Sequence, residues 1–435
     1  MFSEQTLITP KGQRIAIVAA LRTPFHQKDT GFKDSFAIDL GTMVTNELLN
    51  RVPIERDLIQ QLVFGQVTQH SAIQNISRGI AVSLGMPWVQ AYSISSSCIT
   101  GLQAVANVTT SILSGSIKAG IAGGSDSISN SSISLNPRLI QVVKDIIRAE
   151  GLEHKFHLIR NLTWADLKPY GVSLKDYVTD YSVADVSEQM AKNFHISRQE
   201  QDEFTVRSHR LANEAWQGGS IRESVMLSFP SPYDNFVVAD NLIEHSLKPH
   251  RYERYSPIVD KKYGSVTDWN IAKSCDGAGA VMLIREDIAK AEGLDILGYI
   301  RSYAMTGNDV WENMLTGSTY ASSIALSRAN VQLADIDLID MHESSAAQTL
   351  ANLRLFEDEQ FAQHALNRTA ALGQVDMDKF NVLGGSLAYG NPRAVTSLRI
   401  LIQSLFELKR RGGRLSLVAA SGLGGLGAAM VLESE

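Results

Sequence analysis

The alternation of short apolar segments with longer amphipathic segments is the feature of this sequence that most constrains its fold. Residues 89–95 (VQAYSIS) alternate polar and apolar side chains at a period of two, which is typical of a strand. The predicted N-terminal strands are residues 14–20, 62–65, 89–95 and 120–124, and the predicted helices are residues 37–52 and 100–113. Strands that alternate with helices predict an α/β layered fold.

A long middle segment, residues 127–257, breaks this rhythm because it is polar and has no clear strand pattern. Its first part interleaves basic residues with apolar ones, and residues 185–216 have the pattern of two helices, the second beginning after Ser197. The basic residues of the first part are Lys144, Arg148, Lys155 and Arg160. We interpret the whole segment as an inserted lobe.

The rhythm of strands and helices resumes after the inserted lobe. The predicted strands after the lobe are residues 280–284, 297–303, 338–341, 415–420 and 428–432. No residue-level repeat is evident, so the rhythm alone suggests a duplicated fold. We therefore predict an N-terminal half over residues 1–285, which includes the lobe, and a C-terminal half over residues 286–435.

Composition excludes several classes of protein. The chain of 435 residues has a formal net charge of -6, so it has no global basic field for nucleic acid, and an anionic substrate would need a local basic patch. Two cysteines, without C-x-x-C spacing, form neither a disulfide framework nor a metal motif, which favours a reducing cytoplasmic setting. The N-terminus does not resemble a signal peptide, and no uncharged apolar run reaches the roughly 18 residues of a transmembrane helix.

Cys98 is the candidate nucleophile because it follows a predicted strand and directly precedes a predicted helix. A helix N-terminus carries unpaired N–H groups and a positive partial charge, both of which favour a thiolate. The same N–H groups can stabilise the oxyanion that forms when a thioester is attacked. The alternative for Cys98 is a buried cysteine that packs as a small hydrophobic side chain.

Three further motifs lie near the C-terminus. Residues 340–343 (DMHE) end a predicted strand, which places His342 and Glu343 at the edge where α/β sites usually form. Residues 384–393 (GGSLAYGNPR) and 420–427 (ASGLGGLG) are glycine-rich loops. The second loop formally matches G-x-G-x-x-G, but neither a helix nor an acidic residue follows at the required spacing, which argues against a dinucleotide site. Close backbone approach to a ligand or to the nucleophile explains the glycines better.

With these motifs in order, the sequence resembles the thiolase family over nearly its whole length. Within that family it is most similar to the bacterial thiolase (beta) subunit of the fatty-acid oxidation trifunctional complex. The matching stretches are residues 22–25 (RTPF), 64–66 (FGQ), 97–98 (SC), 123–126 (GGSD), 188–191 (EQMA), 276–278 (DGA), 340–343 (DMHE), 384–390 (GGSLAYG) and 424–427 (GGLG).

The resemblance implies a five-layer αβαβα sandwich of two similar halves, with a loop lobe that helps to bind coenzyme A. It implies reversible Claisen condensation or thiolytic cleavage of 3-oxoacyl-CoA, with Cys98 carrying the acyl group as a thioester. The substrates would be coenzyme A thioesters, without a separate cofactor. The family also implies at least a homodimer, with a possible partner subunit. No metal is implied, because His342 has no companion ligands at metal spacing.

The sequence departs from the family pattern around the implied active site. Asn391 stands where thiolases have the histidine that activates the nucleophile, and Ser421 stands where they have a second cysteine that moves the α-proton of acetyl-CoA. A serine hydroxyl is a far weaker acid than a thiol. Arg393 replaces the usual phenylalanine, and Ala272 with Lys273 alters a small-residue stretch. The predicted substrate-binding residues are Ala272, Lys273, Arg393, Gly422 and Leu423.

The retained set Cys98, His342 and Asn391 resembles the cysteine–histidine–asparagine triad of the ketosynthase branch of the superfamily. Histidine and asparagine can supply two donors to an enolate oxygen, and the histidine can take a proton from Cys98 if it comes within reach. Glu343 is either a proton carrier or a buried structural carboxylate.

Three functions therefore remain open. The first is acyl-CoA carbon–carbon chemistry of the thiolase type, for which the departures make efficient thiolysis doubtful. The second is a biosynthetic condensing enzyme that uses the ketosynthase-like triad. The third is a catalytically silent subunit that binds acyl-CoA or scaffolds a complex. The basic residues of the lobe either meet the coenzyme A phosphates, dock a partner subunit or form a solvated charged face.

Overall fold

Two half-sheets with a common strand order form the framework of the protein. The computed structural model describes residues 7–132, 135–169, 175–248, 252–312 and 314–435. The N-terminal strands are β1 (Ile15–Arg22), β2 (His26–Gln27), β3 (Ile59–Gly65), β4 (Gln90–Ile94), β5 (Ala119–Asp126) and β6 (Cys275–Arg285), and the C-terminal strands are β7 (Gly298–Gly307), β8 (Leu338–Met341), β9 (Leu415–Gly422) and β10 (Leu426–Glu433). Their order is β4-β3-β5-β6-β1 followed by β7-β10-β9-β8, and β2 pairs with β6.

The two halves repeat one topology. Along the chain, β1, β3, β5 and β6 correspond to β7, β8, β9 and β10, and each set occupies the same relative positions. The edge position of β4 is taken in the second half by a single bridge between Ile339 and Phe380. The half-sheets meet where β1 pairs with β7 through two residue pairs, Ala16 with Tyr299 and Ile17 with Gly298. The duplication that the sequence rhythm suggested is therefore present in the strand order.

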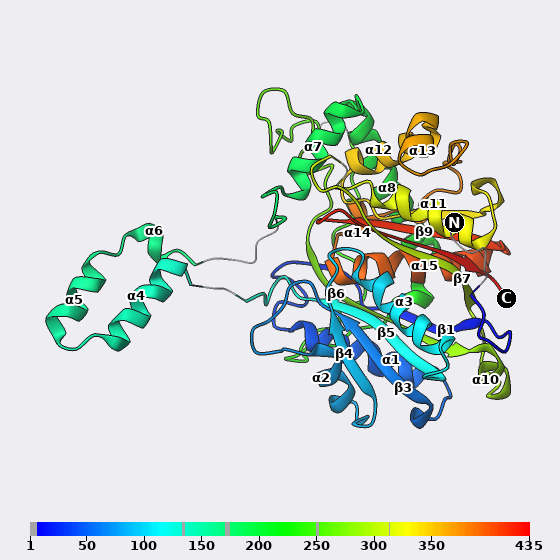
Figure 1. Cartoon of the computed structure of the whole chain (residues 1–435), viewed down its shortest axis with the longest axis horizontal. Coiled ribbons are helices and arrows are strands. Elements are labelled where there is room, and N and C mark those ends of the chain that lie inside the picture. Colours follow the sequence, from blue (N-terminus) through cyan, green and yellow to red (C-terminus); the bar gives the residue numbers. More distant parts are fainter. Residues whose placement is uncertain (1–6, 133–134, 170–174, 249–251, 313) are drawn as a thin grey trace.

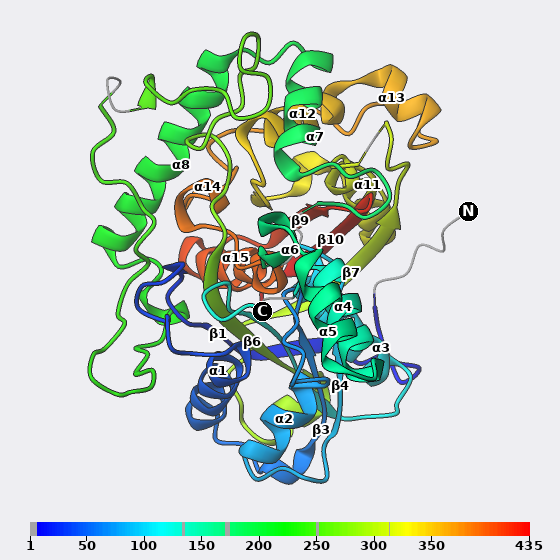
Figure 2. The ribbon, with the colours of Figure 1, turned by 90° about the vertical axis from the view of Figure 1, so that its left-hand side faces the viewer.

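Helices complete five layers, as Figures 1 and 2 show. The central layer is α3 (Thr100–Leu113) with α15 (Thr396–Arg411), one outer layer is α1 (Ala37–Arg51) with α2 (Ile76–Ser83), and the other is α11 (Gly317–Ala329) with α12 (Ala346–Glu357). Three hydrophobic clusters fill the gaps between successive layers. Because both faces of each sheet are covered, strands such as β1 and β5 are buried along their whole length. The predicted αβαβα sandwich is confirmed.

The close approach of α3 and α15 brings two loops together. A Cβ atom on Gly101 would lie 2.7 Å from the Cβ atom of Leu398 and 3.0 Å from the carbonyl oxygen of Ala394, so only glycine lets the two helices pack this closely. The backbone N–H of Leu102 also donates to Ser397 Oγ at 3.2 Å. Since each helix begins at a loop that the sequence marks as functional, this packing joins the Cys98 turn to the glycine-rich loop before α15.

The segment predicted as an inserted lobe, residues 127–257, divides into two parts. Its helices are α4 (Pro137–Arg148), α5 (Leu152–Arg160), α6 (Trp164–Leu167), α7 (Val183–Asn193) and α8 (Arg198–Gly218), and its described residues form no strand beyond isolated bridges. Helices α4, α5 and α6 pack on one another and stand away from the sheets (Figure 1). Helices α7 and α8 pack on α12 and α14 (Ser386–Tyr389) of the C-terminal half. The predicted domain limits stay predictions.

Short elements complete the described chain: α10 (Glu286–Ala291), α13 (Glu359–His364), and the 3-10 helices η1 (Arg56–Leu58), η2 (Arg222–Ser224), η3 (Leu333–Asp335) and η4 (Arg393–Val395). No helix in the described part of the chain has the length and apolar character needed to cross a membrane.

Candidate active site

Cys98 lies on a tight turn between β4 and α3. The preceding residue, Ser97, has a φ of 50°, in the left-handed region that side chains other than glycine seldom adopt. Thr100 holds the turn, because its Oγ1 donates to the carbonyl of Ser97 at 2.6 Å and accepts from the N–H of Ser96 at 2.8 Å. Strained backbone is typical of functional sites, and this turn places the Cys98 side chain in the wall of a cavity.

The cavity has a volume of about 240 Å³ and is bounded by segments that are distant in sequence. Three of the predicted substrate-binding residues, Ala272, Arg393 and Leu423, line it together with Cys98 and Asn391. The other lining residues, which sequence reasoning did not single out, are Val67, Ser97, Ser182, Val183, Ala184, Ile271, Ser274 and Ser344. Ser182 to Ala184 lie at the start of α7, so the inserted segment contributes directly to this cavity.

Asn391 presents its amide group to the sulfur of Cys98. Its Oδ1 accepts hydrogen bonds from Thr396 Oγ1 at 2.6 Å and from the N–H of Arg393 at 2.9 Å. These donors identify the oxygen, so Nδ2 is the atom that faces Cys98 Sγ at 3.5 Å. An amide does not accept a proton near neutral pH, so Asn391 can position or stabilise the sulfur but cannot deprotonate it.

The thiol of Cys98 has its pKa raised above the ordinary value, first because it is buried. The hydrogen bond from Asn391 and the positive charge of Arg393 oppose this effect without overcoming it. That the helix N-terminus favours the thiolate stays a prediction. Burial favours the neutral thiol, so a base that takes its proton would assist the attack of the sulfur.

His342 is fully buried just after β8. Arg399 Nη2 lies 3.3 Å from Ser386 Oγ, and that oxygen lies 2.9 Å from His342 Nδ1. A guanidinium group only donates, so Ser386 Oγ accepts from Arg399, and its hydroxyl group can either donate to His342 Nδ1 or accept from it. Burial, and then the charge of Arg399, lower the pKa of His342 to about 3. The imidazole is therefore neutral, and its buried Nε2 has no hydrogen-bond partner among the described residues.

The predicted triad is thus assembled only in part. Cys98 and Asn391 are in contact, but no hydrogen bond within the described ranges joins His342 to either of them. His342 is also absent from the cavity lining, where the adjacent Ser344 appears instead. A role of His342 as the base for Cys98 requires hydrogen-bond reach between the two side chains, and it stays a prediction.

The contacts of Glu343 favour the buried structural carboxylate over the proton carrier, and its role stays a prediction. Its carboxylate accepts hydrogen bonds from Ser208 Oγ and Asn381 Nδ2, both at 2.7 Å, and from the N–H of Leu387 at 3.2 Å. A Cβ atom on Gly385 would lie only 2.0 Å from the Glu343 carboxyl carbon. Burial raises the pKa of Glu343, while the bonds from Asn381 and Ser208 oppose that rise. The side chain therefore ties the glycine-rich loop to α8 and does not line the cavity.

Ser421 faces α11, away from the Cys98 cavity. Its Oγ accepts from the N–H of Ser318 and contacts Ser318 Oγ, both at 2.8 Å. The next residue, Gly422, supports the nucleophile turn, because a Cβ atom there would lie 2.9 Å from Ser97 Cβ and 3.3 Å from Cys98 N. Only glycine permits this close backbone approach. The hairpin therefore backs Cys98 with Gly422, while Leu423 lines the cavity.

Lys273 and Asp126 stabilise the cavity loops by hydrogen bonds that involve backbone groups. The Lys273 side chain is exposed and does not line the cavity, whereas its carbonyl accepts from Asn391 N–H at 2.8 Å. The buried carboxylate of Asp126 accepts from the N–H groups of Thr68 at 2.6 Å and Ala394 at 2.9 Å, and burial raises its pKa to about 6. Asp126 joins the loop after β3 to the Arg393 turn. It belongs to the GGSD motif, but its distant partners gave no sequence signal.

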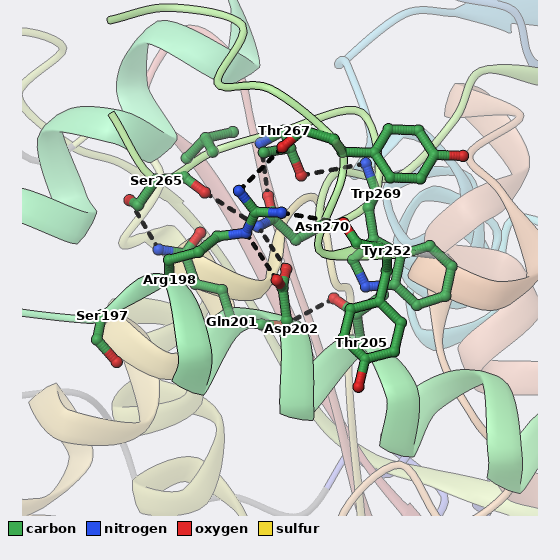
Figure 3. A network of polar contacts seen from close by, with 12 residues as sticks. Ser197, Arg198, Gln201, Asp202, Thr205, Tyr252, Ser265, Thr267, Trp269 and Asn270 are labelled. Carbon is green, nitrogen blue, oxygen red and sulfur yellow. Dashed lines mark hydrogen bonds and ion pairs between the residues drawn. The ribbon is translucent and has the colours of Figure 1, made fainter. Parts of the chain in front are cut away.

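One wall of the cavity is anchored by the polar network in Figure 3. Asn270 Nδ2 donates to Asp202 at 3.2 Å, and Arg198 pairs with the same carboxylate at 2.7 Å. Trp269 stacks on Tyr252 with ring centroids 5.4 Å apart. The wall residues Ile271 and Ala272 follow directly, and Ala272 N–H donates to the Ser344 carbonyl at 3.0 Å. Ser197, as a helix N-cap residue, predicts the start of α8. Nothing in the sequence predicts the contact between Asp202 of this helix and Asn270.

Comparisons with known proteins agree with this architecture. The family described as "Thiolase, N-terminal domain" matches residues 15–287, and "Thiolase, C-terminal domain" matches residues 294–434. The 3-ketoacyl-CoA thiolase of Pseudoalteromonas translucida is 47% identical over 434 residues, which cover 99% of this chain and 100% of the relative. The protein of the same name from Vibrio cholerae is 48% identical over 433 residues, covering 99% and 100%.

Two solved structures share the whole fold. The human mitochondrial 3-ketoacyl-CoA thiolase in complex with CoA has a TM-score of 0.83 and 25% sequence identity, with all of both chains covered. The Bacillus anthracis acetyl-CoA acetyltransferase gives a TM-score of 0.83 and 25% identity with the same coverage. The family matches, the identity of nearly half over the full length, and the shared five-layer fold lead to one conclusion: the chain belongs to the thiolase family.

Proposed function

We propose that this protein is an acyl-CoA C-acyltransferase that makes or cleaves 3-oxoacyl-CoA through an acyl thioester on Cys98. The observation that carries the proposal is the position of Cys98, on a strained turn in the wall of a cavity with the Asn391 amide directed at its sulfur. The curated relatives, which are named 3-ketoacyl-CoA thiolases, support the same chemistry.

In the first step, Cys98 Sγ attacks the thioester carbonyl of an acyl-CoA. A new bond forms between that carbon and Sγ, the bond to the coenzyme A sulfur breaks, and the cysteine proton ends on the departing thiolate. Asn391 Nδ2 lies beside Sγ and orients it for this attack. The cavity walls from α7 and residues 271–274 enclose the acyl group, which supports a substrate-binding role for part of the inserted lobe.

In the second step, a carbon–carbon bond forms or breaks at the acyl carbon on Cys98. Negative charge then develops on an enolate oxygen, which needs hydrogen-bond donors. The buried Nε2 of His342 has no hydrogen-bond partner among the described residues, and an unpaired buried polar atom costs about 1–3 kcal/mol. We assign a proton to this atom and propose that it donates to a substrate oxygen that reaches past Ser344, beyond the cavity lining of this structure. Asn391 and Ser421 replace both proton-transfer groups of ordinary thiolases, so thiolysis should be slow, and the ketosynthase-like condensing function remains the second candidate.

We also propose a cellular compartment and an assembly state for the enzyme. Both cysteines are free thiols, which fits a reducing cytoplasmic compartment. A homodimer or larger assembly, and docking to a partner subunit, stay predictions from the family resemblance.

A product assay tests the proposed function. The protein is incubated with acetyl-CoA and butyryl-CoA, and separately with 3-oxohexanoyl-CoA and free coenzyme A, and the CoA esters are identified by liquid chromatography and mass spectrometry. We expect 3-oxoacyl-CoA chemistry in at least one direction, and its loss in Cys98→Ala. A folded protein that binds these thioesters and converts none of them would instead be the silent subunit.

His342→Ala should separate the two steps. We expect acylation of Cys98 to persist while carbon–carbon bond formation falls by about 10²–10³, the usual cost of one lost oxyanion donor. Quenched-flow mass spectrometry measures acylation, and product release measures the complete reaction. Ser386→Ala, which frees the imidazole to rotate, should show a smaller loss in the same step. An equal fall in acylation and in bond formation would contradict a role confined to the enolate.

A further inference from the structure

Arg393 brings a positive charge into the cavity that holds Cys98. The residue lies between Asn391 and α15, is only partly exposed, and has a φ of 39°. Its backbone is fixed, because its N–H donates to Asn391 Oδ1 and the next N–H, of Ala394, donates to Asp126. These bonds fix the position of the Arg393 backbone at the cavity wall.

No acidic residue lines the described cavity wall. The remaining lining residues are apolar, hydroxyl or amide residues. No carboxylate within the described ranges forms an ion pair or hydrogen bond with the Arg393 guanidinium, whose backbone N–H donates to Asn391. The buried carboxylate of Asp126 interacts electrostatically with Arg393, but its hydrogen bonds come from N–H groups that include those of Thr68 and Ala394. A partly buried guanidinium without a partner is a strong and geometrically selective site for a carboxylate.

We propose that Arg393 binds a carboxylate on the acyl group, so that the enzyme selects coenzyme A thioesters of short dicarboxylic acids. The inference rests on the proposed function, because it places the acyl group on Cys98 in the same cavity. It adds the substrate class, an acyl chain that ends in a carboxylate. The cavity volume of about 240 Å³ accommodates a short acyl chain.

The chemistry of the acyl transfer is unchanged by this assignment. The acyl carbon moves from the coenzyme A sulfur to Cys98 Sγ, one carbon–sulfur bond breaks as the other forms, and the thiol proton goes to the leaving group. The distal carboxylate takes no part in bond changes. It forms charge-assisted hydrogen bonds with Arg393, which orient the chain while its carbonyl carbon reacts.

Succinyl-CoA and butyryl-CoA form a matched pair of probes, because their acyl chains have the same length and differ in the terminal carboxylate. The rate constant for acylation of Cys98 is measured with each by quenching and intact mass. We expect the wild-type protein to prefer succinyl-CoA. Arg393→Leu, whose side chain tolerates the left-handed backbone as well as arginine does, should lower the succinyl-to-butyryl ratio by about 10- to 100-fold. Arg393→Lys should give an intermediate ratio.

The outcomes distinguish three explanations. A ratio that does not change in Arg393→Leu, with both rates reduced together, would mean that Arg393 acts on the Cys98 thiol and would overturn the substrate assignment. A wild-type preference for butyryl-CoA would overturn it without any variant, even if Arg393→Leu fails to fold. No acylation of the wild-type protein by either probe, or by acetyl-CoA, would instead overturn the proposed function itself.

Discussion

Asn391→His is expected to raise the rate of 3-oxoacyl-CoA thiolysis by about 10²–10⁴, the range that a positioned general base contributes. In the native protein, the group beside Cys98 Sγ is an amide at 3.5 Å, which cannot accept the thiol proton. Burial raises the pKa of Cys98, so little thiolate is present without a base. An imidazole at position 391 would lie against the sulfur and supply that base, as the resemblance to thiolases implies.

The measurement is cleavage of 3-oxohexanoyl-CoA by coenzyme A in four proteins: wild type, Asn391→His, Asn391→Ala, and Asn391→His with Ser421→Cys. Asn391→Ala is the matched control, because it removes the amide without adding a base, and it should show no gain. Ser421→Cys should add less than Asn391→His, because position 421 faces Ser318 and not the cavity. Native thiolysis as fast as in Asn391→His would show that the amide does not limit the reaction.

The pH dependence of Cys98 provides an independent check on the same variant. Since the pKa of the native thiol lies above its ordinary value, alkylation by iodoacetamide should keep rising with pH between about 7 and about 9. A histidine partner stabilises the thiolate, so Asn391→His should react faster at neutral pH and approach a plateau earlier. Equal profiles for the two proteins would show that the introduced imidazole does not reach the sulfur.

The fold was largely predictable because its signals are local. The helix predicted at residues 100–113 is α3 (Thr100–Leu113), and the strand predicted at residues 338–341 is β8 (Leu338–Met341). Apolar periodicity indicates such elements without reference to the rest of the chain, and Ser114-Gly115 marks the end of the helix. The separation of residues 127–257 into α4–α6 and α7–α8 was not predictable, because it depends on which surface each helix buries.

The sequence identified several residues of the site but did not predict the directions of their side chains. The motifs identified Cys98 and Asn391, which are in contact. They also identified His342 and Ser421, whose side chains turn to Ser386 and Ser318 instead. A motif fixes where a residue lies along a strand or loop, whereas the direction of its side chain depends on partners contributed by distant segments. For the same reason, the sequence did not predict that Asp126 links two loops of the cavity.

Cys98→Ala should abolish covalent acylation of the protein by acyl-CoA. Removal of the sulfur removes the only atom at the cavity wall that can form a thioester there, because the lining contains no other cysteine. The control is Cys275→Ala, since Cys275 is fully buried in β6 and its pKa is raised well above the ordinary value by burial. That variant should retain acylation, provided that its thermal unfolding shows a native fold.

The role of Cys98 is tested by the intact mass of the protein after incubation with acetyl-, butyryl- or succinyl-CoA, followed by peptide mapping of the modified residue. We expect one acyl group per chain, located on Cys98, in the wild type and in Cys275→Ala, and none in Cys98→Ala. Acylation that persists in a folded Cys98→Ala protein, or a wild type that stays unmodified with every thioester, would contradict the assignment of Cys98 as the acyl carrier.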